Sequence, residues 1–163
     1  MRQVLGAHIV KSAYGQWLPG DARGHWSSDY DPKFGYTQPH HLHTGDPARE
    51  RMAAELLKHP PVTWSPEMAA VLADTLHRCA AESDWAIAAL AIEPTHLHLL
   101  VTASTRKLDG TCKWLSQQMT RAVHDHTAHQ GPVFAKGKWL SYIDDDGQWE
   151  NTIEYINRHP GVH

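Results

Sequence analysis

The sequence has few cysteines and no long apolar run. Its 163 residues include 2 cysteines, Cys79 and Cys112, both in segments with helical patterning. These cysteines indicate small buried side chains in a reducing compartment rather than a disulfide framework. The longest wholly apolar run, residues 85–92, is much shorter than the ~20 residues of a membrane-spanning helix. Residues 1–10 also lack the apolar stretch and cleavage site of a secretory signal, so we expect a cytoplasmic protein with no membrane partner.

A surplus of basic residues is also missing. Lysine and arginine number 15 against 18 aspartate and glutamate residues, which gives a formal net charge of -3. Proteins that coat duplex DNA rely on a basic field, so this balance argues against that class but leaves room for a local basic groove. The chain contains no phosphate-binding loop of the GxxxxGKS or GxxxxGKT type, so no nucleotide cofactor is expected.

The order of predicted elements indicates an α+β domain. Periodicity and turn residues predict strands over 2–10, 85–92, 96–103 and 139–143, and helices that begin at Asp46 and Ser65 or cover 108–127 and 147–159. Without a long irregular insertion at about 14–45, the order is β-α-β-β-α-β plus a C-terminal helix. This is the ferredoxin-like plan, an antiparallel sheet with helices on one face, and we expect residues 1–163 to form one domain.

Histidine is abundant, with 14 residues, and it is the commonest metal ligand in proteins. Three His-x-His pairs occur, where about one is expected by chance: His41/His43 in the irregular segment, His124/His126 late in a helix, and His96/His98. Only the last pair lies in a predicted strand, where residues i and i+2 share a face and both rings reach one metal ion. Exposed strand histidines without a role are the alternative.

The last predicted helix holds a phenol and an imidazole in register. Tyr155 lies outside the apolar seam of Trp149, Ile153 and Ile156, and His159 follows it at i+4 on the same side. Taken singly, each residue is more typical of an ordinary amphipathic helix, with tyrosine packing at the edge and histidine near the negative end of the helix dipole.

Several polar and aromatic residues are candidates for DNA contacts. Lys113, Gln117 and Arg121 recur every four residues and form a stripe on one helix, although a solvated helix face has the same pattern. The loop candidates, where aromatic rings can stack on unpaired bases, are Arg23, Trp26, Lys136 and Lys138.

Taken together, these segments resemble the tyrosine HUH transposases of small bacterial insertion sequences, including their REP-associated relatives. The resemblance is carried by THLHLLV at 95–101, KWLSQQM at 113–119, EYIN at 154–157 and YGQWLPGDARG at 14–24. It covers most of the chain in order, and the combination of short motifs carries its specificity.

The resemblance implies a metal-dependent endonuclease and strand transferase, a transposase, that acts on single-stranded or hairpin DNA. Tyr155 would be the nucleophile that forms a 5′-phosphotyrosine bond, and His96 and His98 would be metal ligands. The family's third ligand is often a glutamine four residues after the tyrosine, and His159 stands in that place. The resemblance also implies a homodimer and a bacterial, nucleoid-associated protein.

A divalent metal ion is the expected cofactor. The family context suggests Mg²⁺ or Mn²⁺, and Co²⁺ or Zn²⁺ are further candidates because three histidines are softer ligands than Mg²⁺ prefers. Two alternatives stay open. One is a domesticated or inactive relative that binds single-stranded or hairpin DNA without cleaving it, and the other is an unrelated hydrolase with a His-x-His metal site.

Overall fold

The structure is a computed structural model. It describes residues 3–18, 20–22, 25–27, 30–31, 35–36 and 41–163. The chain divides into two compact units, one formed by Met1–Tyr14 with Val62–His163 and the other by Gly15–Pro61. Within the described residues, no helix has the length and apolarity needed to cross a membrane.

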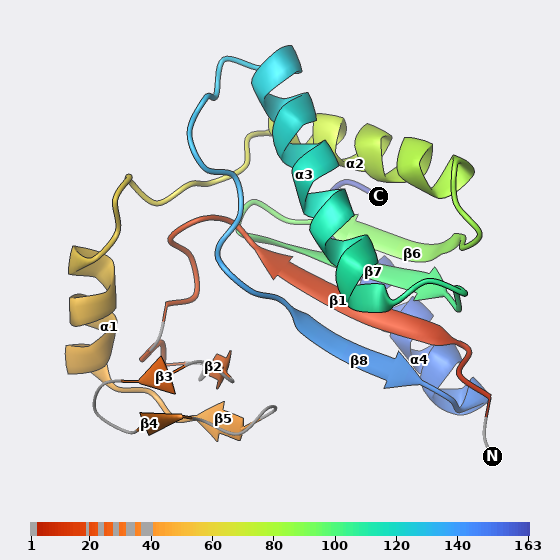
Figure 1. Ribbon diagram of the computed structural model, residues 1–163, viewed down its shortest axis with the longest axis horizontal. Helices are drawn as coiled ribbons and strands as arrows, with labels where there is room; N and C mark the ends of the chain where they lie inside the picture. Colours follow the sequence, from red (N-terminus) through yellow and green to blue (C-terminus); the bar gives the residue numbers. More distant parts are fainter. Residues whose placement is uncertain (1–2, 19, 23–24, 28–29, 32–34, 37–40) are drawn as a thin grey trace. The chain divides into compact units, whose positions relative to one another are not determined.

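The first unit is built on a four-stranded antiparallel sheet (Figure 1). In spatial order the strands are β6 (Ile87–Ile92), β7 (His96–Thr102), β1 (Gly6–Ser12) and β8 (Trp139–Ile143). The first and third strands along the chain are thus the central pair, with the second and fourth at the edges. This order and the helices between the strands confirm the ferredoxin-like α+β plan. The first strand begins at Gly6 rather than at residue 2.

Helices cover both faces of this sheet (Figure 1). α2 (Pro66–Ala81) and α3 (Leu108–His126) pack on one face, and α4 (Asp146–Asn157) packs on the other. α2 begins as its sequence predicts, because the Ser65 hydroxyl accepts a hydrogen bond from the backbone N–H of Met68 and Pro66 is the first helical residue. Cys79 and Cys112 are buried and free, as expected.

Alternation along β7 separates the two faces chemically. Leu97, Leu99 and Val101 belong to the large apolar core beneath α2 and α3. Since successive strand residues point to opposite faces, His96, His98 and Leu100 face the side that α4 covers. There the apolar core is small, with five buried residues: Ala89, Ala91, Leu100, Ile143 and Ile156.

Ile156 is the buried residue of α4, with 0% of its surface exposed. We expect Ile156→Ala to lower the free energy of unfolding by about 2–5 kcal/mol, because it removes apolar contacts and leaves a cavity between α4 and the sheet. Urea unfolding followed by circular dichroism measures the change. The exposed Glu150→Ala on the same helix should shift stability by less than about 0.5 kcal/mol. Equal small losses in both variants would contradict the packing of α4.

The second unit corrects the prediction of an irregular segment over 14–45. β2 (His25–Ser27) pairs with β5 (His41–His43), and β3 (Tyr30–Asp31) pairs with β4 (Gly35–Tyr36). The pair His41/His43 therefore lies on a short strand, not in a loop. Pairings of two or three residues are too short to produce a detectable alternation in the sequence.

α1 (Pro47–Glu55) also lies in the second unit. Its start is as predicted, since the Asp46 carboxylate accepts hydrogen bonds from the backbone N–H groups of Ala48 and Arg49. The large apolar side chains of this segment are not buried, with Met52 65% exposed and Leu56 80% exposed. The sequence pattern thus predicted the helix but not its packing.

Candidate metal centre and tyrosine

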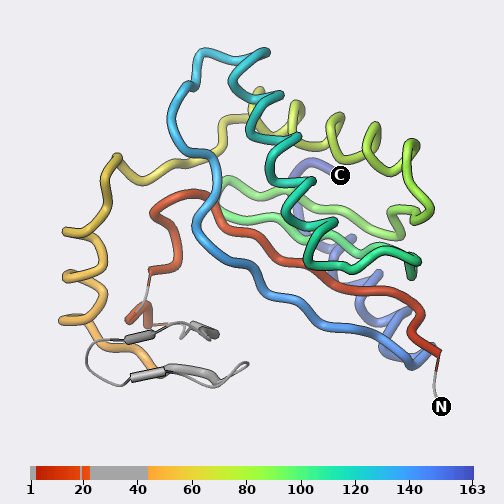
Figure 2. The backbone as a smooth tube through the Cα atoms, in the orientation of Figure 1, coloured from red at the N-terminus to blue at the C-terminus, as the bar shows by residue number. Residues whose placement is uncertain are grey.

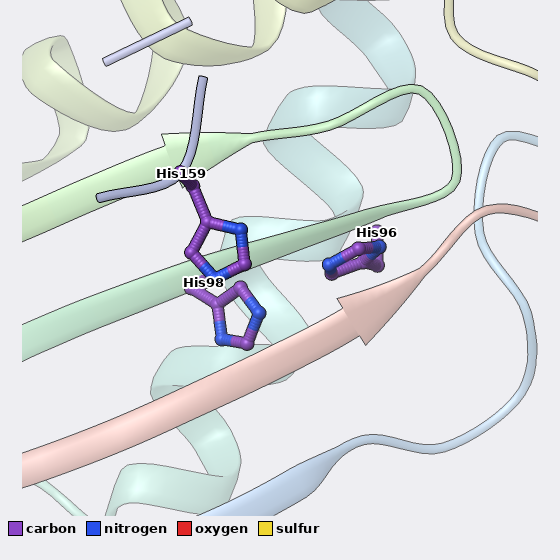
Figure 3. Close-up of side chains that lie close together, drawn as sticks. All are labelled: His96, His98 and His159. Carbon is purple, nitrogen blue, oxygen red and sulfur yellow. The ribbon is translucent and has the colours of Figure 1, made fainter. Parts of the chain in front are cut away.

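Three histidines from two separate segments meet on the α4 side of the sheet (Figure 3). His96 and His98 come from β7, and His159 follows the end of α4. The ring centroids of His98 and His159 are 4.6 Å apart, and His96 lies 5.1 Å from His98 and 5.9 Å from His159. These are the three histidines that the sequence and its resemblance selected.

His159 is held in place by the segment that follows α4. Residues 159–163 turn back to β6, where Ile92 and Val162 form two backbone hydrogen bonds of 2.7 and 3.0 Å. Figure 2 traces this return from α4 to the edge of the sheet. The close approach requires a glycine at position 161, because a Cβ there would lie 2.1 Å from the carbonyl oxygen of Ile92.

Tyr155 lies beside the histidines of its own chain. Its ring centroid is 5.1 Å from that of His159 and 5.4 Å from that of His98. The next residue, Ile156, points into the core, so Tyr155 stands at the edge of α4 with 51% of its surface exposed. The phenol is therefore accessible to a large substrate while it contacts the histidine cluster.

The donor set fits a transition-metal ion. Each of the three histidines offers one ring nitrogen, and these nitrogens lie within 4.8 Å of one another. Two imidazole nitrogens bound to one ion at ~2.1 Å would be about 3–3.5 Å apart, so small ring rotations bring the cluster to ligand distances. Three neutral imidazoles suit Mn²⁺, Co²⁺ or Zn²⁺ better than Mg²⁺, which prefers oxygen ligands.

Burial keeps the centre of the cluster neutral. It lowers the pKa of His98 to about 3, with a further contribution from the neighbouring histidines, of which His8 is the largest. Burial is also the main cause that lowers the pKa of His8 to about 4, and the nearby His159 adds a smaller electrostatic effect. Both rings are therefore uncharged at neutral pH, and a neutral imidazole is the form that binds a metal ion.

These two pKa values predict acid sensitivity of the metal-free protein. Unfolded histidines take up protons near pH 6.5, whereas folded His8 and His98 do so only near pH 4 and 3. The unfolded state thus binds more protons in this window, and the free energy of unfolding should fall as pH drops from about 6.5 to 4. Urea unfolding across this range should show a shallower fall for His8→Gln than for wild type. The exposed control His77→Gln should match wild type, and identical slopes in all three proteins would contradict the shifts.

His8 is a site residue that sequence reasoning missed. Its Nε2 lies 3.0 Å from Nδ1 of His98, and both side chains are buried. Its ring also meets the edges of Trp139 at 5.1 Å and Tyr155 at 6.4 Å between centroids. The available signal was its position in the predicted first strand, which a ferredoxin-like order places beside the His96/His98 strand.

A hollow of about 400 Å³ adjoins the tyrosine. Its lining combines His8 and Tyr155 with residues at the start of α4, among them Asp145, Gln148 and Asn151. Amide and carboxylate side chains such as these can hydrogen-bond the polar edges of an unpaired base. The tyrosine thus borders both the histidine cluster and a polar recess.

None of the DNA-contact candidates whose side chains the structure describes lies at this site. Lys113, Gln117 and Arg121 are exposed on α3, the helix layer on the opposite face of the sheet. Lys138 forms an ion pair with Asp109 at 2.5 Å. Lys136 is exposed in the connection before β8. Arg23 and the side chain of Trp26 lie outside the described residues. The role of all seven in DNA binding stays a prediction.

Comparisons with known proteins give structural matches only. No protein-family model and no curated protein matches the sequence. The chain is similar to the crystal structure of a "putative transposase" from Deinococcus radiodurans R1, with 14% identity, a TM-score of 0.52 and coverage of 98% of this chain and 94% of that one. It is also similar to a REP-associated tyrosine transposase bound to a REP hairpin, with 11% identity, a TM-score of 0.48 and coverage of 96% and 67%.

The first of these two structures supports the fold of the chain. At 14% identity the first likeness shows the fold alone, and a TM-score below 0.5 leaves the second without weight. The likeness to the Deinococcus radiodurans structure agrees with the ferredoxin-like α+β fold that the sequence resemblance implied.

Proposed function

We propose that the protein is a metal-dependent endonuclease and strand transferase that acts on single-stranded or hairpin DNA. The observation that carries this proposal is the juxtaposition of Tyr155 with His98 and His159, at ring-centroid distances of 5.4 and 5.1 Å. On this fold, a phenol beside a three-histidine cluster places a nucleophile next to a candidate cation site. Tyr155 is the nucleophile, and His96, His98 and His159 are the metal ligands.

The reaction is a transesterification at phosphorus. The Oη of Tyr155 attacks the scissile phosphate, the Oη–P bond forms and the P–O3′ bond breaks. The phenol loses its proton, and the leaving 3′ oxygen gains one, so the products are a 5′-phosphotyrosine and a free 3′-OH. Because the bond energy is conserved, a later 3′-OH can reverse the step without ATP.

The residues around Tyr155 suit this chemistry. A phenol, with a pKa near 10, is a weak nucleophile at neutral pH unless charge on the phosphate is neutralised. A divalent ion on the three histidines would supply that neutralisation as a Lewis acid and would orient the phosphate. The recess beside Tyr155 gives the flanking nucleotide a polar surface.

A denaturing gel tests the proposal directly. Incubation with single-stranded or hairpin oligonucleotides and Mn²⁺ should yield a covalent protein–DNA adduct that survives detergent. Binding of the same oligonucleotides without an adduct would instead support the non-cleaving relative. Hydrolysis of other substrates without any need for Tyr155 would support the unrelated metal hydrolase.

The remaining parts of the proposal concern organisation. Residues 1–163 form one HUH transposase-like domain, and the second compact unit is its insertion. We further propose a homodimer and a cytoplasmic, nucleoid-associated location, both from the sequence resemblance. Light scattering of the purified protein tests the dimer.

A further inference from the structure

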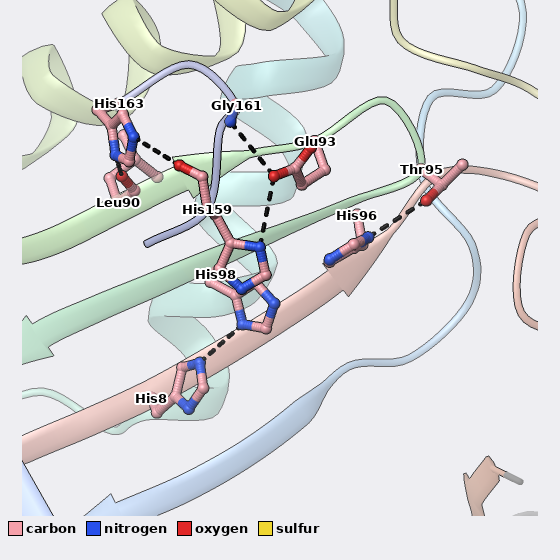
Figure 4. A network of polar contacts seen from close by, with 9 residues as sticks. All are labelled: His8, Leu90, Glu93, Thr95, His96, His98, His159, Gly161 and His163. Atoms are coloured by element: carbon pink, nitrogen blue, oxygen red, sulfur yellow. Dashed lines mark hydrogen bonds and ion pairs between the residues drawn. The ribbon is translucent and has the colours of Figure 1, made fainter. Parts of the chain in front are cut away.

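Each histidine of the cluster has its Nδ1 atom engaged by a different partner (Figure 4). Nδ1 of His98 lies 3.0 Å from Nε2 of His8. Nδ1 of His159 lies 3.4 Å from a carboxylate oxygen of Glu93, and Nδ1 of His96 lies 3.2 Å from the hydroxyl of Thr95. The three partners come from β1 and from the turn between β6 and β7.

We propose that His8, Glu93 and Thr95 are positioning residues that make all three histidines present Nε2 to one cation. The inference rests on the proposed metal site and adds which atoms bind and what orients them. Figures 3 and 4 show that the other ring nitrogen of each histidine, Nε2, points toward the space between the three rings.

The same assignment of hydrogen-bond donor and acceptor nitrogens applies to all three rings. A neutral imidazole has one N–H and one lone pair, and a metal ion needs the lone pair. If Nε2 binds the ion, Nδ1 carries the proton and donates it to Nε2 of His8, to the Glu93 carboxylate or to the Thr95 hydroxyl. Each of these partner atoms can accept a hydrogen bond, so one tautomer assignment satisfies every contact.

His8 and Glu93 are themselves fixed in the fold. His8 is 8% exposed on the central strand β1, where its ring contacts the edge of Trp139. The Glu93 carboxylate also accepts a hydrogen bond of 3.3 Å from the backbone N–H of Gly161, which anchors it to the segment that carries His159. Neither partner needs to move to orient its histidine.

The first test measures metal affinity rather than activity. Titration of the full-length protein with Co²⁺, followed by its visible absorption, should give one strong site in wild type. His8→Phe and Glu93→Leu remove the acceptor and should each weaken Co²⁺ binding by about 10–100-fold. His8→Gln and Glu93→Gln keep an acceptor oxygen and should lose much less. The control His77→Gln removes an exposed histidine on α2, away from the site, and should bind as wild type does.

The second test needs no substitution and no metal. Nitrogen-15 NMR of the imidazoles in the metal-free protein should place the proton of neutral His98 on Nδ1. A proton on its Nε2, or unchanged Co²⁺ affinity in both acceptor-free variants, would overturn the inference while leaving the cation site intact. No Co²⁺ binding by wild type would overturn the cation site and the inference together.

Discussion

Tyr155→Phe is expected to abolish the covalent protein–DNA adduct and to lower strand cleavage by about 10⁴-fold or more, as loss of a covalent nucleophile does in other enzymes. The substitution removes one oxygen and keeps the ring that contacts His98 and His159. Stability and oligonucleotide binding should therefore be unchanged. The measurement is the adduct band on a denaturing gel, quantified with labelled DNA and Mn²⁺.

Tyr142→Phe is the matched control, because Tyr142 is also exposed, at 62%, and lies on β8 away from the cluster. It should keep full adduct formation. An adduct of wild-type yield in Tyr155→Phe would exclude Tyr155 as the nucleophile. Equal loss in both variants would point to a general effect on the domain.

A mixing experiment asks whose tyrosine serves which metal site. Tyr155 lies beside the histidines of its own chain. A mixture of Tyr155→Phe with His98→Ala should therefore remain inactive, since neither chain has both parts. Restored adduct formation would show that the tyrosine acts in the site of a partner subunit.

The sequence predicted the fold well where a single element has a strong pattern. The helix starts at Asp46 and Ser65 followed from a capping side chain and a proline at the first turn, and both are present. The strand with His96 and His98 followed from its alternation with buried residues. These signals are local, because the residues that cause each element lie within one short stretch of the sequence.

What could not be predicted depends on contacts between distant segments. The Nδ1 contact between His8 and His98 joins residues 90 positions apart, and no local pattern marks it. Glu93 stood in a hairpin connection and gave no sign of its contact with His159. The prediction missed the short strands of the second unit for another reason. Strands of two residues, such as those that pair Tyr30 with Tyr36, are too short to show an alternation of apolar and polar residues.

Removal of the metal ion is expected to have the second large effect. In the predicted site His96, His98 and His159 would hold the cation. The cation would neutralise charge on the phosphate, which is otherwise a barrier of several kcal/mol to attack by a phenol. Because each 1.36 kcal/mol is a factor of ten in rate, excess EDTA should lower cleavage by about 10³-fold or more. The same loss is expected for His98→Ala, whose ring lies at the centre of the cluster.

The order of rescue by added metals carries more information than the loss itself. Three imidazole nitrogens favour Mn²⁺, Co²⁺ and Zn²⁺, so Mn²⁺ or Co²⁺ should restore cleavage at lower concentration than Mg²⁺. Oligonucleotide cleavage in a metal series after dialysis against chelator measures this order. Substitution of His159 by glutamine supplies an oxygen ligand in place of a nitrogen and should shift the preference toward Mg²⁺. Cleavage that persists in excess EDTA would exclude a catalytic metal, and an unaltered metal order in His159→Gln would remove His159 from the ligand set.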